Sequence, residues 1–565
     1  MNTTKRLYFY GVASVSLAVT AYGSALLVQY VLDLVSGRTI AGDLVDRVAI
    51  GLAMVVVGAP LWLVHWAFAQ RQAARQPAEA QSSLRALYLY GSMFAAALIA
   101  FVQVRHLLEW ALGAKTWETR WAGELATWGV VWAYQWTVSR RETPGSAGVE
   151  TQSSPASSTV RRWYVYATSG FTLAFAGLGL ATLLGLLFDR AYDGLTGVPA
   201  LAGQGFWTNE AKRGLASLAA GGIWWAFHWL YLARGDIESA LRQVYLYLFA
   251  FLGGALTVLL SAGRILQVVL QWVLGAPGLA GASIHFRDVA SILASLSVGA
   301  ALLLYHWQVV QEESRQLAGG SSAARRSFRY IMSGAGISAV ASGAIVLLGV
   351  LLGVVLPEAR EPLVSTAAWR DTLATALTLL LIGAPLWYWY WPRIQRQARA
   401  GGAEERGALA RRIYVYGVLG ALALAALGSL VFFLTAFLSD ALKGQLSLDF
   451  LREGKWAVGV VITASALLPY HWQVLREDQR AGAESAPRKK SVTLVMGGDG
   501  AEDVARDLAK GLNMRVRLVL IVSDAPAPVL AEGRLAELAD QVRATPSDRV
   551  IVIADRDEIR VYGHG

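Results

Sequence analysis

Long apolar stretches alternate with short basic connections along most of the chain. Residues 49–68 form a stretch of twenty positions without a formal charge, and a helix of that length crosses about 30 Å of hydrocarbon. The stretches 290–311, 372–391 and 458–474 have the same character. This pattern predicts an all-α polytopic membrane protein with about twelve transmembrane helices, which occupy residues 1–480.

Two motifs divide this region into repeats. A basic residue ahead of an aromatic pair opens each repeat, at Lys5 with Tyr8 and Tyr10, Arg85 with Tyr88 and Tyr90, Arg161 with Tyr164 and Tyr166, Arg242 with Tyr245 and Tyr247, and Arg411 with Tyr414 and Tyr416, with a degenerate copy at Arg326, Arg329 and Tyr330. A His-Trp pair closes four repeats, at His65–Trp66, His228–Trp229, His306–Trp307 and His471–Trp472, and Gln135–Trp136 and Tyr390–Trp391 close the other two. The motifs predict six parallel two-helix repeats, at about 5–75, 84–142, 160–236, 241–315, 326–398 and 411–478.

Arg-x-x-Tyr-x-Tyr at the start of one helix and His-Trp at the end of the next resemble the repeat of a bacterial family of multi-spanning membrane proteins, which is classified as a domain of unknown function. The likeness covers about residues 1–480, and Gln135 and Tyr390 depart from its His-Trp pattern. The resemblance implies architecture only, because the family brings no activity, cofactor or catalytic residues with it.

The charge distribution predicts orientation and partners. The chain has a formal net charge of +10, but its arginines gather in the connections, which is typical of topology signals rather than of a nucleic-acid surface. More Lys and Arg flank the N-terminus and the connections between repeats than the connections within repeats, so both termini are expected in the cytoplasm. We expect a multi-pass protein of a bacterial-type plasma (inner) membrane, whose cytoplasmic arginines contact anionic lipids of the bilayer.

The C-terminal part has a different composition. A linker at 481–490 ends in the basic residues Arg488, Lys489 and Lys490, and residues 491–565 alternate short strand and helix patterns. They predict a cytoplasmic α/β domain with strands at 492–496, 516–522, 550–554 and 559–562 and helices at 501–512 and 531–544. The turn 497–500 has glycines but also Asp499, which favours a strand-to-helix turn over a phosphate site. Asp555–Asp557 is expected to form the last turn, and His564 to lie in a disordered tail.

The four His-Trp histidines are open to two interpretations. His65, His228, His306 and His471 lie at matching depths and could ligate haem. Polar aromatic side chains also anchor helices at membrane interfaces, and the chain has 21 Trp and 21 Tyr. The presence of Gln135 and Tyr390 at the same position favours anchoring.

A second polar group lies near the predicted outer ends of two helices. It comprises Gln103, Arg105, His106 and Glu109 of the third helix and Arg264 and Gln267 of the seventh. Snorkelling of the charged ends to the interface is one interpretation, and a ligand site between repeats two and four is the other.

Activity is less well constrained than architecture. The chain has no cysteine, which excludes disulfides and thiolate chemistry, and it has no phosphate-loop or zinc-hydrolase motif. No catalytic residue, metal or cofactor is therefore predicted. The repeats favour a structural or interaction module over an enzyme, with a possible protein partner for the C-terminal domain. A transporter or channel with a polar path, or a haem-binding electron carrier, are the alternatives.

Overall fold

The computed structural model describes residues 3–37, 41–142, 155–197, 205–275, 281–316, 323–356, 368–444, 449–485, 491–497, 500–512, 514–521, 532–545, 547, 549–555 and 558–564. Most of them are helical, and a small sheet lies near the C-terminus. The chain divides into two compact units, Met1–Ala400 with Ala408–Val474 and Gly401–Gly407 with Leu475–Gly565.

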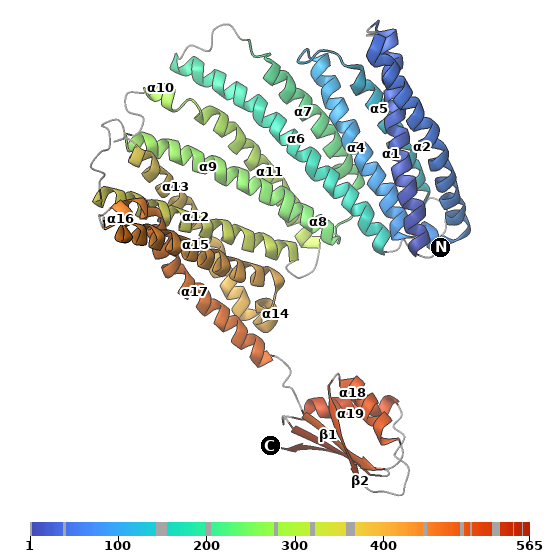
Figure 1. The fold of residues 1–565 in the computed structure, drawn as a ribbon, viewed down its shortest axis with the longest axis vertical. Helices are drawn as coiled ribbons and strands as arrows, with labels where there is room; N and C mark the ends of the chain where they lie inside the picture. The colour runs from blue at the N-terminus through green and yellow to red at the C-terminus, as the bar shows by residue number, and fades with distance from the viewer. Residues whose placement is uncertain are drawn as a thin grey trace. The chain divides into compact units, whose positions relative to one another are not determined.

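The helices form three blocks in chain order, each made from two helical hairpins (Figure 1). Block 1 comprises α1 (Thr3–Val35), α2 (Ala41–Arg75), the short α3 (Pro77–Ala80), α4 (Ser83–Ala111) and α5 (Thr119–Glu142). Block 2 comprises α6 (Pro155–Thr196), α7 (Asn209–Trp225), the π-helix η1 (Ala226–Leu232), α8 (Ala240–Val244), the π-helix η2 (Tyr245–Phe251), α9 (Leu252–Val273), α10 (Ala282–His285) and α11 (Val289–Gln316). Block 3 comprises α12 (Ala323–Val355), α13 (Ala368–Ala400), α14 (Gly402–Arg406), α15 (Leu409–Leu442), α16 (Asp449–Glu453) and α17 (Lys455–Ser485).

Ten helical segments in the described part of the chain are long and apolar enough to cross a membrane. The helix α5 and the segment formed by α7 and η1 are not among these ten. Both carry charged residues at their first turns and several Trp and Tyr residues, as at Trp128, Trp132 and Tyr134 of α5. Their polar aromatic content makes them less hydrophobic than their neighbours, so the number of crossings stays a prediction.

Glycine pairs allow the two helices of a hairpin to approach closely. The helix pairs α1 and α2, α6 and α7, and α12 and α13 pack against each other along their lengths. A glycine on each helix lies at each contact, at Gly23 with Gly51, Gly179 with Gly214, and Gly336 with Gly383. A Cβ atom added to Gly179 would lie 2.5 Å from the carbonyl oxygen of Gly214. Close backbone contact of this kind is how apolar helices gain packing energy where water does not drive their association.

The C-terminal unit contains a four-stranded sheet in the order β2-β1-β3-β4. Its elements are β1 (Ser491–Gly497), α18 (Ala501–Leu512), β2 (Val516–Ile521), α19 (Glu532–Ala544), β3 (Arg549–Asp555) and β4 (Glu558–His564). β1 is parallel to β2 and β3, and β3 pairs with β4 as an antiparallel hairpin. Alternate residues of β1, among them Leu494 and Met496, share a core with Leu508 of α18 and Val542 of α19.

The expected strands and helices of this unit are present, and their ends differ from the expectation by at most two residues. The expectation of a disordered tail at His564 is wrong, because His564 pairs with Arg549 in the β3–β4 ladder. Arg488 to Lys490 of the linker, Gly498 and Asp499 of the first turn, and Arg556 and Asp557 of the last turn lie outside the described residues.

Candidate functional site

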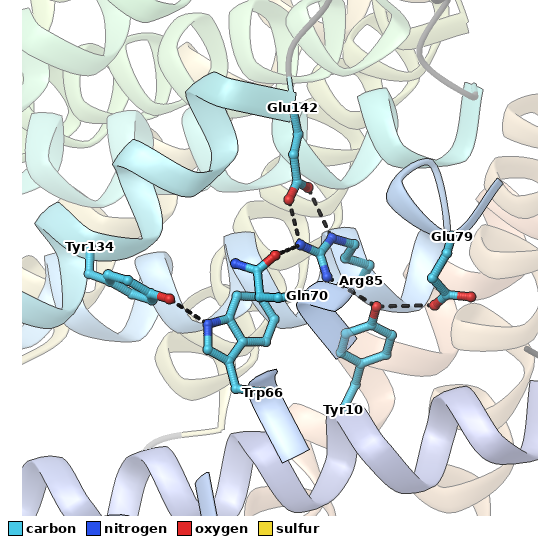
Figure 2. A network of polar contacts seen from close by, with 7 residues as sticks. All are labelled: Tyr10, Trp66, Gln70, Glu79, Arg85, Tyr134 and Glu142. Atoms are coloured by element: carbon cyan, nitrogen blue, oxygen red, sulfur yellow. Dashed lines mark hydrogen bonds and ion pairs between the residues drawn. The ribbon is translucent and has the colours of Figure 1, made fainter. Parts of the chain in front are cut away.

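A buried arginine joins the two hairpins of block 1. The side chain of Arg85, near the start of α4, is fully buried. Its Nε donates to Glu142 Oε2 at 3.0 Å, its Nη2 to Gln70 Oε1 at 2.6 Å, and its Nη1 to Tyr10 OH at 3.3 Å. Figure 2 shows these groups converging on the guanidinium from α1, α2 and α5. We call Arg85 and these partners the block 1 clamp.

A second carboxylate extends the clamp. Tyr10 OH donates to Glu79 Oε1 at 3.1 Å, and Arg6 Nε donates to Glu79 Oε2 at 2.9 Å. Glu79 belongs to the four-residue helix α3 and is fully buried. Two cations and two carboxylates are thus linked through one phenol, and Figure 2 shows that phenol between Arg85 and Glu79. A buried charge is tolerable only when it is paired and hydrogen-bonded, and this network meets that condition.

An indole lies against the guanidinium of the clamp, and further aromatic residues hydrogen-bond beside it. Arg85 Cζ lies 5.0 Å from the centroid of the Trp66 ring, a cation–π distance. Trp66 Nε1 donates to Tyr134 OH at 2.6 Å, and Trp62 Nε1 donates to Tyr88 OH at 2.9 Å. The aromatic residues of both motifs therefore hold α2 against the hairpin that follows it.

Block 2 repeats the same network at matching positions. Arg242 donates to Glu313 Oε1 through Nε at 2.8 Å and lies 4.5 Å from the Trp229 ring centroid. Tyr166 OH donates to Asp236 Oδ2 at 2.8 Å, and Arg162 Nε donates to Asp236 Oδ1 at 3.0 Å. The hydrogen bonds from indole to phenol also recur. Trp229 Nε1 donates to Tyr305 OH, and Trp225 Nε1 donates to Tyr245 OH.

In block 2 the network lies within π-helical backbone. The π-helix η1 contains His228 and Trp229, and η2 contains Tyr245 and Tyr247. A π-turn inserts extra backbone into a helix and changes the directions of the side chains that follow. In block 2 the π-helical turns contain the His-Trp motif that ends the first hairpin and the Tyr-x-Tyr motif that begins the second.

Block 3 retains the aromatic half of the network. Trp391 Nε1 donates to Tyr470 OH at 2.6 Å, and the Trp391 and Tyr414 rings are 4.8 Å apart. Arg411 Nη2 donates to Gln395 Oε1 at 2.8 Å, as Arg85 does to Gln70 in block 1. The Trp-to-Tyr contacts therefore recur in all three blocks, whereas the arginine–carboxylate bond is present in blocks 1 and 2.

The four motif histidines are buried among the helices. His228, His306 and His471 are at most 1 % exposed and His65 is 8 % exposed. Each Nδ1 lies within hydrogen-bond distance of the carbonyl oxygen four residues earlier, which fixes the ring. His228 Nε2 lies 2.9 Å from Tyr164 OH. The Nε2 atoms of His306 and His471 have no hydrogen-bond partner in the described part of the chain. Interfacial anchoring and haem ligation both stay predictions.

The predicted ligand group separates into two clusters. In the first, Glu109 is fully buried and is contacted by Arg105 Nη1, by His106 Nδ1 at 3.3 Å and by Lys115 Nζ at 3.0 Å. Gln103 Nε2 donates to Glu124 Oε2 of α5 at 2.7 Å. The charges of this cluster pair with one another and Gln103 joins α4 to α5, while the buried atoms Gln103 Oε1 and Arg105 Nε have no hydrogen-bond partner among the described residues.

The second cluster belongs to other helices. Arg264 Nη1 donates to Gln267 Oε1 at 2.8 Å, and Gln267 Nε2 donates to Thr375 Oγ1 of α13 at 2.9 Å. Among the described residues, no hydrogen bond or ion pair joins Arg264 or Gln267 to the first cluster. The two clusters of the predicted ligand group therefore lie in different blocks.

The motif analysis missed the acidic partners of the clamp arginines. Glu142 and Glu313 lie seven residues after Gln135 and His306, the closing positions of their repeats. This spacing places them about two helical turns further along the same face. The recurrence of an acid at this spacing is the signal that could have identified them.

Comparison with known proteins agrees with this block structure. A family model described as a domain of unknown function (DUF5671) matches the chain three times, at residues 6–134, 162–287 and 326–466. Each match begins within the first helix of a block, and the resemblance inferred from the motifs is thereby confirmed. No curated protein and no solved structure matches the chain.

Proposed function

The chain belongs to the DUF5671 family. From its long apolar helices and its buried clamps, we propose that it is a plasma-membrane scaffold that crosses the bilayer twelve times and carries a cytoplasmic α/β domain. In this proposal its role is structural: two clamped blocks and a third that retains the aromatic contacts form a rigid membrane body. Binding of a protein partner to the C-terminal domain is part of the proposal.

The buried clamps are the observation that supports a structural role. In blocks 1 and 2 each clamp arginine is held by a carboxylate from the last helix of its own block. Breaking such a pair leaves an uncompensated charge in a low-dielectric interior. An arrangement that satisfies its charges internally resists rearrangement, which suits a scaffold better than a moving part.

A transporter or channel needs a polar path between helices. The cavity of about 450 Å³ beside α1 and α5 is lined mainly by Leu, Val and Ala side chains. The cavity of about 360 Å³ between α4, α5 and α7 is likewise apolar, with His228 as its one ionisable residue. These two cavities do not favour ion or solute passage.

The absence of native cysteine allows a direct test of topology. Single cysteines introduced at Ser36, after α1, and at Ala400, at the end of α13, would occupy opposite sides of the membrane in the proposed orientation. Both positions are exposed. In intact cells, a membrane-impermeant maleimide should label Ser36→Cys and should label Ala400→Cys only after lysis.

The cysteine-free parent protein is the control for background labelling. Labelling of Ala400→Cys in intact cells would contradict the proposed orientation. Recovery of the parent protein in the soluble fraction, rather than with membranes, would contradict the proposal as a whole.

A further inference from the structure

A groove of about 510 Å³ lies in block 2, between α6 and α9 and over α11. One end is apolar, with Leu178 on α6 and Leu260 on α9. The other end has Asp189 on α6, Glu210 at the start of α7 and Arg264 on α9. The groove is therefore amphipathic along the helix direction.

The charged end lies one membrane thickness from the block 2 clamp. Asp189 follows Tyr164 by 25 residues on α6, and Arg264 follows Tyr245 by 19 residues along η2 and α9. At 1.5 Å per residue these separations are about 37 and 28 Å, close to the thickness of the hydrocarbon core. If the clamp lies at one interface, as proposed, these charges lie among the headgroups of the other.

The two carboxylates of the groove are not paired within the described part of the protein. Asp189 and Glu210 have no hydrogen bond or ion pair in the described part of the chain, and the nearby Arg287 pairs with Asp193 at 3.0 Å. Arg264 uses Nη1 on Gln267, which leaves other guanidinium donors for a ligand.

The hydroxyl of a largely buried serine also lines the groove. Ser261 is 7 % exposed, lines the groove, and its hydroxyl makes no hydrogen bond with any described residue. A hydroxyl that reaches the groove without an internal partner can still donate and accept hydrogen bonds. The hydroxyl of Ser261 is a second observation, separate from the charged residues, that points to a polar ligand in the groove.

We propose that this groove binds a zwitterionic phospholipid with a primary ammonium headgroup. Asp189 and Glu210 accept hydrogen bonds from the ammonium, Arg264 donates to the phosphate, and the apolar end receives an acyl chain. Two carboxylates against one guanidinium give the groove a net negative charge, which disfavours anionic lipids. This inference rests on the proposed membrane placement.

The test uses the full-length protein in detergent with equal amounts of phosphatidylethanolamine, phosphatidylcholine and phosphatidylglycerol, followed by native mass spectrometry. The wild-type protein should retain phosphatidylethanolamine selectively, because choline has no N–H donor and phosphatidylglycerol is anionic. The double variant Asp189→Asn/Glu210→Gln should reduce this preference about tenfold, equivalent to one charge-assisted hydrogen bond.

Arg213→Gln is the matched control, because it removes an exposed charge of α7 that does not line the groove. It should retain the wild-type preference. Equal retention of the three lipids by the wild-type protein would overturn the inference, whatever the variants do. Displacement of the lipid by free phosphoethanolamine at the same concentration would overturn the assignment to a lipid. If the protein did not enter membranes, the proposed function itself would be contradicted. The maleimide-labelling experiment detects that outcome separately from lipid selectivity.

Discussion

The block 1 clamp and the block 2 groove are built from similar residues but differ in what their charges contact. In the clamp, Arg85 is fully buried and bonds to Glu142, Gln70 and Tyr10. In the groove, Arg264 is exposed and bonds to neither of the carboxylates that line the same groove. Charged side chains that pair with one another hold helices together. Charged side chains without such a partner are available to a ligand.

Replacement of the clamp arginine should produce the largest effect. Arg85→Met removes one buried charge and leaves Glu142 without its partner, so the free energy of unfolding should fall by about 3–5 kcal/mol. Arg264→Met should change it by less than about 0.5 kcal/mol, since the side chain is exposed. Denaturant titration in mixed micelles, followed by tryptophan fluorescence, measures both changes. Equal losses of unfolding free energy in the two variants would contradict the proposed difference between the clamp and the groove.

A smaller effect is expected at the glycine contact on α6, at Gly179, which directly follows the groove residue Leu178. Gly179→Val places side-chain atoms against the backbone of α7, where even a Cβ would lie 2.5 Å from Gly214 O. The free energy of unfolding should fall by about 1–3 kcal/mol. Gly177→Val is the control, because the nearest atoms to its Cβ are side-chain carbons at 3.7 Å. The same titration compares them, and a loss at Gly177 as large as at Gly179 would argue against a specific contact.

The smallest effect concerns single hydroxyls at the two sites. Tyr88→Phe removes the acceptor of the Trp62 indole at 2.9 Å and of Gln135 Nε2 at 3.2 Å, and should cost about 1 kcal/mol. Ser261→Ala removes a hydroxyl without an internal partner and should leave stability unchanged or slightly raised. Thermal unfolding of both variants in detergent without added lipid gives the comparison. Stabilisation by Tyr88→Phe would show that the two hydrogen bonds to its phenol do not hold the hairpins of block 1 together.

Local patterns in the sequence were sufficient for the elements of the C-terminal unit. The predicted helix 501–512 matches α18 at both ends, and the predicted strand 516–522 differs from β2 by one residue. Alternating apolar residues and bounding turns carry this information within short windows. The error at His564 arose because strand pairing with Arg549 depends on a residue outside the local window.

The candidate site was less accessible to sequence analysis. The Tyr-x-Tyr and His-Trp motifs identified Tyr10, Trp66 and Tyr88, but they contain none of the clamp carboxylates. Arg85 and Glu142 are 57 residues apart, and Arg6 and Glu79 are 73 apart. Such pairs are brought together only by the packing of hairpins on one another.

The sequence by itself determined the apolar helices, their repetition and the α/β composition of the C-terminal unit, because hydrophobic periodicity and motif spacing are properties of neighbouring residues. Tertiary structure alone decided which charges are paired. It divided the predicted polar group into a cluster of paired charges around Glu109 and the cluster of Arg264 and Gln267. The physical reason is that the free energy of a buried charge depends on the atoms around it, and those atoms come from helices distant in the chain.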